Sequence, residues 1–175
     1  LTLGTGCAGQ TLLSWLHRDE LPDAVWFILG TAVHETIERI ILDGLTLDEA
    51  QADVRINLDI AIGEADQIIE SGSKRAKRSL ATAYDYAEML INNWWKDVHP
   101  DSEHRNPIFN LYQWPPKVEH EIRLDDIGLY TTVDAIFTAK PGEAPFGEDI
   151  LIVDWKTGNS RSSHESQLQV YMYGG

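Results

Sequence analysis

Apolar residues recur at helical spacing through roughly the first hundred positions of the 175-residue chain. With about 3.6 residues per turn, such spacing predicts amphipathic helices that each bury one stripe of side chains. The first predicted helix lies within residues 22–44, with Asp23 as a plausible cap and Gly44 as its end. Its expected buried stripe consists of Leu29, Val33, Ile37 and either Ile40 or Ile41.

Two further helices are predicted before residue 99. A capping box, Thr46 with Glu49 three residues later, opens a helix that we expect to run to about Glu70. The polar segment "SGSKRAKRS" then interrupts the pattern. A third helix follows, with a buried stripe of Leu80, Ala83 or Tyr84, Ala87, Leu90 or Ile91, and Trp94. Residues 99–116 are rich in proline and histidine and show little periodicity, which predicts a loop.

The pattern then changes to period two, which is typical of strands. "KVEHEIRL" and "LYTTVDAIF" alternate and are separated by the turn "DDIG", whereas "AKPGEAPFGED" is a longer connection. "ILIVDW" is a continuous apolar run, which predicts a central strand buried on both faces. Residues 162–175 predict a final helix. Helices followed by three strands and a helix indicate a mixed α/β fold with the helices packed on the sheet.

Composition narrows the class of protein. A hydrophobic content of 43% with six tryptophans is typical of a globular chain, and no apolar run approaches the ~20 residues that span a bilayer. The first residues lack the basic and apolar parts of a secretory signal, and the lone Cys7 predicts a reducing compartment without an internal disulfide. The net charge of −14 argues against a broad nucleic-acid-binding surface but permits carboxylates gathered around a metal ion.

Three charged residues stand at the ends of the predicted strands. Asp154 and Lys156 are two positions apart and share a strand face, while Trp155 points to the other face. Asp134 lies late in the preceding strand, so neighbouring strands would bring two carboxylates together, and such a pair implies Mg²⁺ or Mn²⁺. The plainer interpretation is an exposed Asp134 and a polar strand end that meets water.

Other candidate residues lie on helices. His34 follows Gly30 by one turn, and a helical histidine is more often structural than a ligand. "HETIE" begins like a zinc-protease motif, but Glu38 stands where the second histidine is required, which argues against a zinc peptidase. In "QLQVY", Gln167 and Tyr171 share a face, as in any amphipathic helix. The basic cluster Lys74–Arg78 indicates a solvated helix start more readily than a phosphate track.

The order of these features resembles the RecB-type branch of the PD-(D/E)XK nuclease superfamily. The residues that carry the resemblance are "GTAVHE", "VEHEIRL", "TTVDAIF", "IVDWKTG" and "QLQVY", and they extend from Gly30 to Tyr171. That branch includes the nuclease domains of RecB and AddB, CRISPR-associated RecB-like exonucleases and phage exonucleases. The resemblance implies a restriction-endonuclease-like core, in which helices flank a mixed central β-sheet. It also implies a single nuclease domain over residues 1–175, mostly helical in 1–98 and with the sheet and catalytic core in 117–175.

The resemblance also assigns roles to residues. It implies a metal site of His34, Asp134, Asp154 and the backbone carbonyl of Trp155, with Mg²⁺ or Mn²⁺ as cofactor. Lys156 would be the catalytic cation, and Gln167 and Tyr171 would position DNA or the lysine. A glutamate on the first strand is also expected. We favour Glu121 over Glu119, although both lie on one face and alternation alone does not separate them.

The expected function is a metal-dependent deoxyribonuclease that hydrolyses phosphodiester bonds, as a RecB-like exonuclease in recombination, repair or defence. DNA ends or single strands are the expected substrates, and a recombination or helicase protein is a possible partner. The expected location is the cytoplasm of a bacterial or phage-infected cell, with no membrane association. The alternative is a catalytically inactive nuclease fold that serves as a nucleic-acid-binding or assembly subunit.

Two departures from the family pattern give further expectations. The family fold has a strand after the Gln-x-x-x-Tyr helix, so the last core strand is expected to be missing from a sequence that ends at Gly175. Several relatives hold an iron–sulfur cluster with one cysteine before the Gly-x-x-x-His helix and three after the tyrosine helix. Cys7 suits the first position, so a cluster is expected only if three cysteines follow Gly175.

Overall fold

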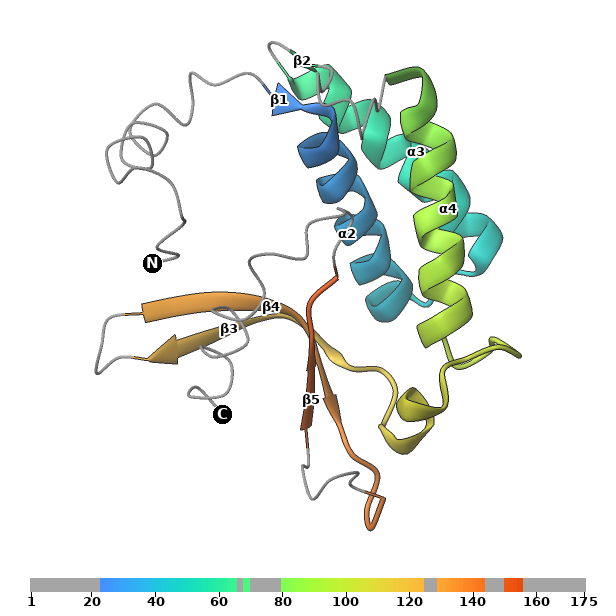
Figure 1. The fold of residues 1–175 in the computed structure, drawn as a ribbon, viewed down its shortest axis with the longest axis vertical. Coiled ribbons are helices and arrows are strands. Elements are labelled where there is room, and N and C mark those ends of the chain that lie inside the picture. The colour runs from blue at the N-terminus through green and yellow to red at the C-terminus, as the bar shows by residue number, and fades with distance from the viewer. Residues whose placement is uncertain (1–22, 66–67, 70–79, 125–128, 144–149, 156–175) are drawn as a thin grey trace, which may run out of the picture.

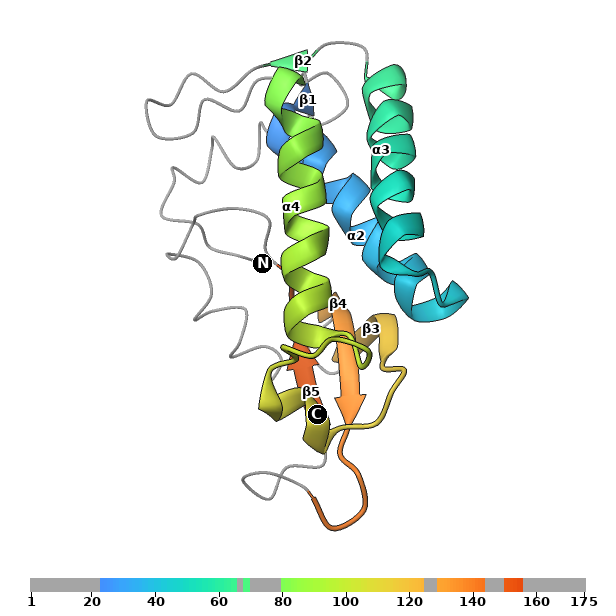
Figure 2. The same cartoon turned by 90° about the vertical axis from the view of Figure 1, so that its right-hand side faces the viewer.

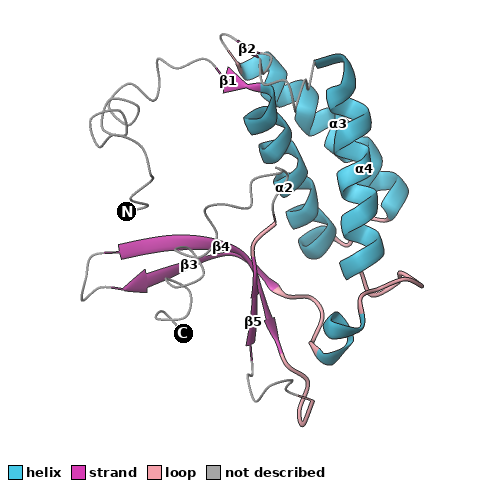
Figure 3. Ribbon diagram, in the orientation of Figure 1, coloured by secondary structure: helices cyan, strands magenta, loops and turns pink. Residues whose placement is uncertain are grey.

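The computed structural model describes residues 23–65, 68–69, 80–124, 129–143 and 150–155. In this part of the chain, the fold is mixed α/β, with three α-helices, a three-stranded antiparallel sheet and a separate two-stranded parallel pair. Figure 3 shows the helices gathered on one side of the molecule and the strands of the larger sheet on the other. The elements follow in the order β1 (Asp23–Ala24), α2 (Val25–Asp43), α3 (Leu47–Glu64), β2 (Ile68–Ile69), α4 (Leu80–Val98), the 3₁₀ helix η2 (Pro107–Leu111), β3 (Lys117–Leu124), β4 (Leu129–Thr138) and β5 (Ile150–Val153).

The first helix buries the stripe that its periodicity predicts. Leu29, Val33 and Ile37 are buried, and so are both Ile40 and Ile41, because α2 packs against α3 and α4 at once. The prediction of Asp23 as the cap is wrong. Asp23 lies in β1, where it pairs with Ile68 of β2, and the helix begins two residues later at Val25.

The capping box that opens the second helix is confirmed. The Thr46 hydroxyl accepts from the Glu49 amide at 3.4 Å, and the Thr46 amide donates to the Glu49 carboxylate at 2.8 Å. The helix ends at Glu64 rather than near Glu70. Its end is earlier because the backbone becomes extended at Ala65, and Ile68–Ile69 then pairs with β1.

The third helix begins at Leu80, as predicted, and the structure shows which of the alternative residues in its apolar stripe are buried. Its buried residues are Ala83, Ala87, Ile91, Trp94 and Val98, so Ala83 and Ile91 face the core in preference to Tyr84 and Leu90. The predicted loop after it contains one regular element, η2. Pro107 occupies its first turn, and the Asn106 side chain accepts from the Ile108 amide at 3.1 Å, which satisfies a donor at the start of η2.

The two strands predicted by period two and the strand predicted from the apolar run are confirmed, and their order is β3-β4-β5. The third strand is shorter than predicted, because β5 ends at Val153, before Asp154 and Trp155. The β3–β4 pairing runs the length of β3 and reaches Ile136 of β4, from Leu124↔Leu129 at the turn to Lys117↔Ile136. The β4–β5 pairing is restricted to Ala135–Thr138 of β4. Figure 1 shows the consequence: the β3–β4 hairpin bends midway, and only its half beyond the bend pairs with β5, whose end points toward α2.

The prediction of a central, fully buried third strand is wrong for the part of the sheet that the structure describes. Here β4 is central, and β5 lies at the edge with partly buried or exposed residues. Its continuous apolar run has a different cause. Leu151 and Val153 pack against the main core, whereas Ile152 packs with Val133 on the other face, so each face contacts apolar side chains without full burial.

Helices and sheet share one hydrophobic core. Phe137 of β4 is fully buried in the same cluster as Leu29, Leu58 and Ile91 of the three helices. Figure 2 shows α4 alongside α2 and α3, with its C-terminal end directed toward the strands. None of the helices in the described ranges has the combination of length and apolar character that crossing a membrane requires.

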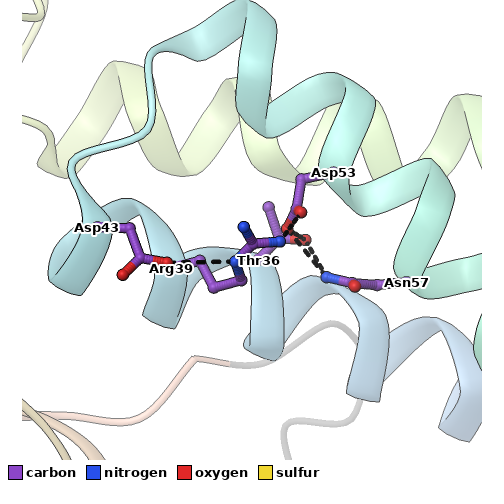
Figure 4. A network of polar contacts seen from close by, with 5 residues as sticks. All are labelled: Thr36, Arg39, Asp43, Asp53 and Asn57. Atoms are coloured by element: carbon purple, nitrogen blue, oxygen red, sulfur yellow. Dashed lines mark hydrogen bonds and ion pairs between the residues drawn. The ribbon is translucent and has the colours of Figure 1, made fainter.

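A buried polar network joins α2 to α3 (Figure 4). The Asp53 carboxylate, 6% exposed, accepts hydrogen bonds from Thr36 at 3.2 Å and from Asn57 at 3.0 Å, and it pairs with Arg39. Arg39 also donates to Asp43 at 3.3 Å. Buried charges are tolerated when they are paired and hydrogen-bonded, so this network fixes how α2, the helix that carries His34, lies against α3.

Candidate metal centre

The candidate site forms where α2 meets β4 and the residues that follow β5. His34 lies midway along α2, and its ring contacts two partners that are distant in sequence. Its Nε2 lies 3.0 Å from the carbonyl oxygen of Trp155, and its Nδ1 lies 3.5 Å from Oδ1 of Asp134. Both partners lie beside the end of the β4–β5 pairing at Ala135↔Val153, since Asp134 precedes Ala135 by one residue and Trp155 follows Val153 by two.

Asp134 connects the two strands at the point where their ladder ends. Its Oδ2 accepts a hydrogen bond from the backbone N–H of Trp155, and only 14% of its side chain is exposed. The Trp155 peptide groups therefore contact both side chains, since the N–H binds Asp134 and the C=O binds His34. The backbone after β5 is held by these contacts instead of by further ladder hydrogen bonds.

Glu119 of β3 completes a group of three. Single ligand atoms of His34, Glu119 and Asp134 all lie within 4.8 Å of one another. The register places Glu119 opposite Asp134, between the pairs Val118↔Ala135 and His120↔Val133. Glu119 has a positive φ of 46°, which is unfavourable for a residue with a Cβ, by roughly 1–2 kcal/mol. Strained backbone of this kind is concentrated at functional sites, where the surrounding structure enforces it.

The charged groups of the site shift one another's pKa values. Burial lowers the pKa of His34, but Asp134, the Trp155 carbonyl and Glu119 together raise it above its ordinary value. Burial raises the pKa of Glu119, and the negative charges of Asp134 and Glu38 raise it further, while His34 opposes the shift. Two carboxylates thus share one imidazole, with a third carboxylate nearby on α2. Such a site favours an added proton or an added cation.

The residues present fit a hard divalent ion. One imidazole nitrogen and two carboxylates are suitable donors for Mn²⁺, and the carboxylates suit Mg²⁺. Two neighbouring ligand atoms with bonds of ~2.1 Å lie roughly 3 Å apart, and the Nδ1–Oδ1 separation is 3.5 Å. When Nε2–H donates to the Trp155 carbonyl, the Nδ1 lone pair faces Asp134. This is the arrangement in which a backbone carbonyl fixes the tautomer of a metal-binding histidine.

The structure brings together some of the predicted site residues, while others lie outside the residues that it describes. His34, Asp134 and the Trp155 carbonyl meet, although that carbonyl contacts His34 here. Asp154 is partly buried beside them but is not one of the three grouped residues. Lys156, Gln167 and Tyr171 lie outside the described residues, as do Cys7 and the basic cluster Lys74–Arg78.

Glu119, rather than the favoured Glu121, is the strand glutamate that the structure brings to His34. Glu121 pairs with Thr132, two positions along the strand from Asp134. The sequence contained a signal for this choice. A four-residue turn, "DDIG", makes Leu124 and Leu129 partners, and counting back along both strands puts Glu119 opposite Asp134.

Comparison of the chain with protein-family models, with curated proteins and with solved structures gave no match.

Proposed function

We propose that this chain is a divalent-metal-dependent DNA nuclease with a restriction-endonuclease-like core of the RecB type. One observation carries the proposal. Histidine and aspartate from motifs 100 positions apart in sequence meet beside the backbone of Trp155, between Asp154 and Lys156. The order of the motifs predicts this meeting, and an arbitrary helical histidine has no reason to contact that strand end.

The chain's own residues have distinct roles in the proposed reaction. His34, neutral and held by the Trp155 carbonyl, presents Nδ1, while Asp134 and Glu119 supply carboxylate oxygens. Mg²⁺ or Mn²⁺, when bound, lowers the pKa of a water molecule and withdraws charge from a phosphate group. Lys156 follows Trp155 directly and would stabilise the negative charge that develops on the phosphate as a point charge.

The Trp155 N–H keeps Asp134 oriented during this chemistry. A carboxylate that accepts a backbone hydrogen bond has one oxygen committed and the other available to a ligand. Asp154 lies next to this arrangement and is proposed as the further metal-binding carboxylate. Gln167 and Tyr171 are proposed to contact DNA or Lys156, on the strength of the motif order alone.

The proposed substrate is DNA at ends or in single strands, in recombination, repair or defence. A helicase or recombination protein is the proposed partner, and a bacterial or phage-infected cell the proposed setting. The charge of −14 fits a cleft that engages few phosphates, because a nuclease that tracked long duplexes would need more basic surface.

The test is degradation of end-labelled single- and double-stranded DNA with Mg²⁺ or Mn²⁺. Lys156→Ala and Asp134→Asn are expected to lower the rate at least 100-fold, since loss of one charge-stabilising group costs about 10²–10³ in rate. Lys96→Ala is the matched control, because Lys96 is an exposed lysine in the last turn of α4 and should leave the rate unchanged. Equal degradation by wild type and Lys156→Ala, or activity that resists chelation, would refute the proposal.

A second candidate is a nuclease fold that serves only for binding or assembly. The observation in its favour is that His34, Asp134 and Trp155 satisfy one another's hydrogen bonds without an ion. In that case the three residues tie α2 to the sheet. Stability of the wild-type protein would then not respond to Mn²⁺, and no variant at the site would change DNA degradation.

A further inference from the structure

The geometry of the candidate site depends on the backbone of a single residue, Trp155. Its N–H binds Asp134 and its C=O binds His34, so a shift of this peptide would displace both side chains. The β4–β5 ladder ends at Val153, two residues earlier. No strand pairing therefore orients the Trp155 peptide groups, and the side chain of Trp155 is a further attachment besides their contacts with Asp134 and His34.

The indole ring of Trp155 is the evident anchor. It packs edge-to-face on the ring of Trp94, with centroids 5.7 Å apart and planes at 85°. Trp94 also contacts Trp114 at 6.4 Å, and Trp114 contacts Phe137 of β4 at 6.5 Å. The four rings, which we call the aromatic cluster, join the last turns of α4 to the strand that carries Asp134.

Trp94 is set into the core as a packing residue. It is 7% exposed, and its indole nitrogen has no hydrogen-bond partner among the described residues. A buried indole N–H normally finds a partner. Within the described residues, the ring is therefore oriented by contacts with neighbouring rings and not by a hydrogen bond of its own.

We propose that Trp94 is a positioning residue for the metal site. Its ring fixes the indole of Trp155, and the Trp155 peptide groups in turn hold His34 and Asp134 in register for a shared ligand. That this positioning serves a metal site rests on the proposed nuclease function. The positioning itself is a property of the metal-free protein and can be measured without DNA or metal.

The test is hydrogen exchange of the Trp155 amide in the full chain, metal-free and uniformly labelled with ¹⁵N. Trp94→Leu is expected to speed this exchange at least tenfold, while the Leu58 amide of α3 keeps its protection and reports an intact fold. Trp94→Phe keeps a ring edge against Trp155 and should restore slow exchange. Trp95→Leu is the matched control, because Trp95 stacks on His99 and has no ring contact with Trp155.

A second measurement, of Mn²⁺ affinity, tests whether the Trp94–Trp155 contact supports the metal site. Mn²⁺ affinity, followed by electron paramagnetic resonance, should fall about tenfold in Trp94→Leu and remain at the wild-type value in Trp94→Phe and Trp95→Leu. If Trp94→Leu does not fold, Trp155→Ala decides, since it removes the ring but keeps the peptide groups. Fast amide exchange and weakened Mn²⁺ binding are expected in that variant.

The outcomes separate this proposal from the proposed function. An unchanged exchange rate of the residue-155 amide in Trp94→Leu or in Trp155→Ala overturns the positioning role, whatever the protein does to DNA. Wild-type protein that binds Mn²⁺ and shows the Trp94 effect but leaves DNA intact refutes the nuclease and keeps the positioning role. Failure of wild type to bind Mn²⁺ overturns the metal-site part of both.

Discussion

Replacing Asp134 by asparagine removes one charge from the centre of the site and keeps its shape. The asparagine oxygen can still accept the Trp155 N–H, but the side chain no longer attracts a protonated His34 across 3.5 Å. A hydrogen bond to a charged group contributes about 1.5–3 kcal/mol. Relief of the repulsion between Asp134 and Glu119 offsets part of this loss. We expect the metal-free variant to be less stable than wild type by about 1–2 kcal/mol at pH 6.

The effect of metal separates the two proteins further. A ligand at 100 times its dissociation constant stabilises a folded protein by about 2.7 kcal/mol. Wild type should gain this amount from Mn²⁺, and Asp134→Asn should gain almost none. For a chain of this length, about 2–4 °C in melting temperature corresponds to 1 kcal/mol. The difference in melting temperature should therefore grow from roughly 2–8 °C without metal to roughly 7–19 °C with it.

The assay is calorimetric melting of both proteins at pH 6, with Mn²⁺ and with chelator. Asp101→Asn provides the matched control, because Asp101 is an exposed aspartate in the loop after α4. It should follow wild type in both conditions. Equal stabilisation of wild type and Asp134→Asn by Mn²⁺ would show that the ion binds elsewhere and would rule out Asp134 as a ligand.

Three further predictions test other parts of the structure. In a Mn²⁺ titration, Glu119→Asn should weaken binding more than tenfold, because asparagine tolerates the positive φ of this position but lacks the charge. Glu121→Gln should change binding less than twofold, and equal effects of the two variants would contradict the grouping of Glu119 with His34 and Asp134. Because the pKa of His34 is raised in the fold, protonated His34 stabilises the metal-free protein below about pH 6.5, and this contribution is lost as pH rises through the folded pKa. Mn²⁺ affinity should rise over the same interval. Melting and binding profiles that do not change with pH would contradict this role of His34. Asp53→Ala should cost about 1–3 kcal/mol in urea unfolding, because the buried Thr36 and Asn57 lose their acceptor while the half-exposed Arg39 can be solvated. The exposed Asp43→Ala is the near-neutral control, and an Asp53 effect no larger than that of Asp43 would show that the network is not needed.

The helices were predictable because each has one buried face. The stripes of α2 and α4 recur every third or fourth residue, so periodicity alone locates them. Their ends were less predictable. The end of α3 and the start of α2 depend on the pairing of β1 with β2, which joins positions about 45 residues apart. No local pattern contains that contact.

The strands were predicted, but the place of β5 in the sheet was not. A continuous apolar run indicates contact on both faces, and Leu151 and Ile152 do contact apolar residues on opposite sides. Such a run carries no information on which neighbours complete the ladder. In the described part of the sheet, β4 takes the central position because β3 and β5 each pair with it.

Some residues of the candidate site could likewise be predicted from the sequence, and others could not. His34 and Asp134 could be selected because their residue types and order suggest metal chemistry, and the structure brings them together. The choice between Glu119 and Glu121 required the hairpin register, since alternation places both on one face. The contact between Trp94 and Trp155 was out of reach of sequence patterns, because aromatic partners are chosen by tertiary packing.

In the proposed nuclease, His34 and Asp134, with a neighbouring carboxylate, hold a divalent ion that serves DNA hydrolysis. Anomalous diffraction from crystals of the full chain grown with millimolar Mn²⁺ tests it most directly. We expect a peak bonded to Nδ1 of His34 and to Asp134, with Glu119 or Asp154 as a further ligand. A map without a peak there, in which His34 still contacts Asp134 directly, would contradict it.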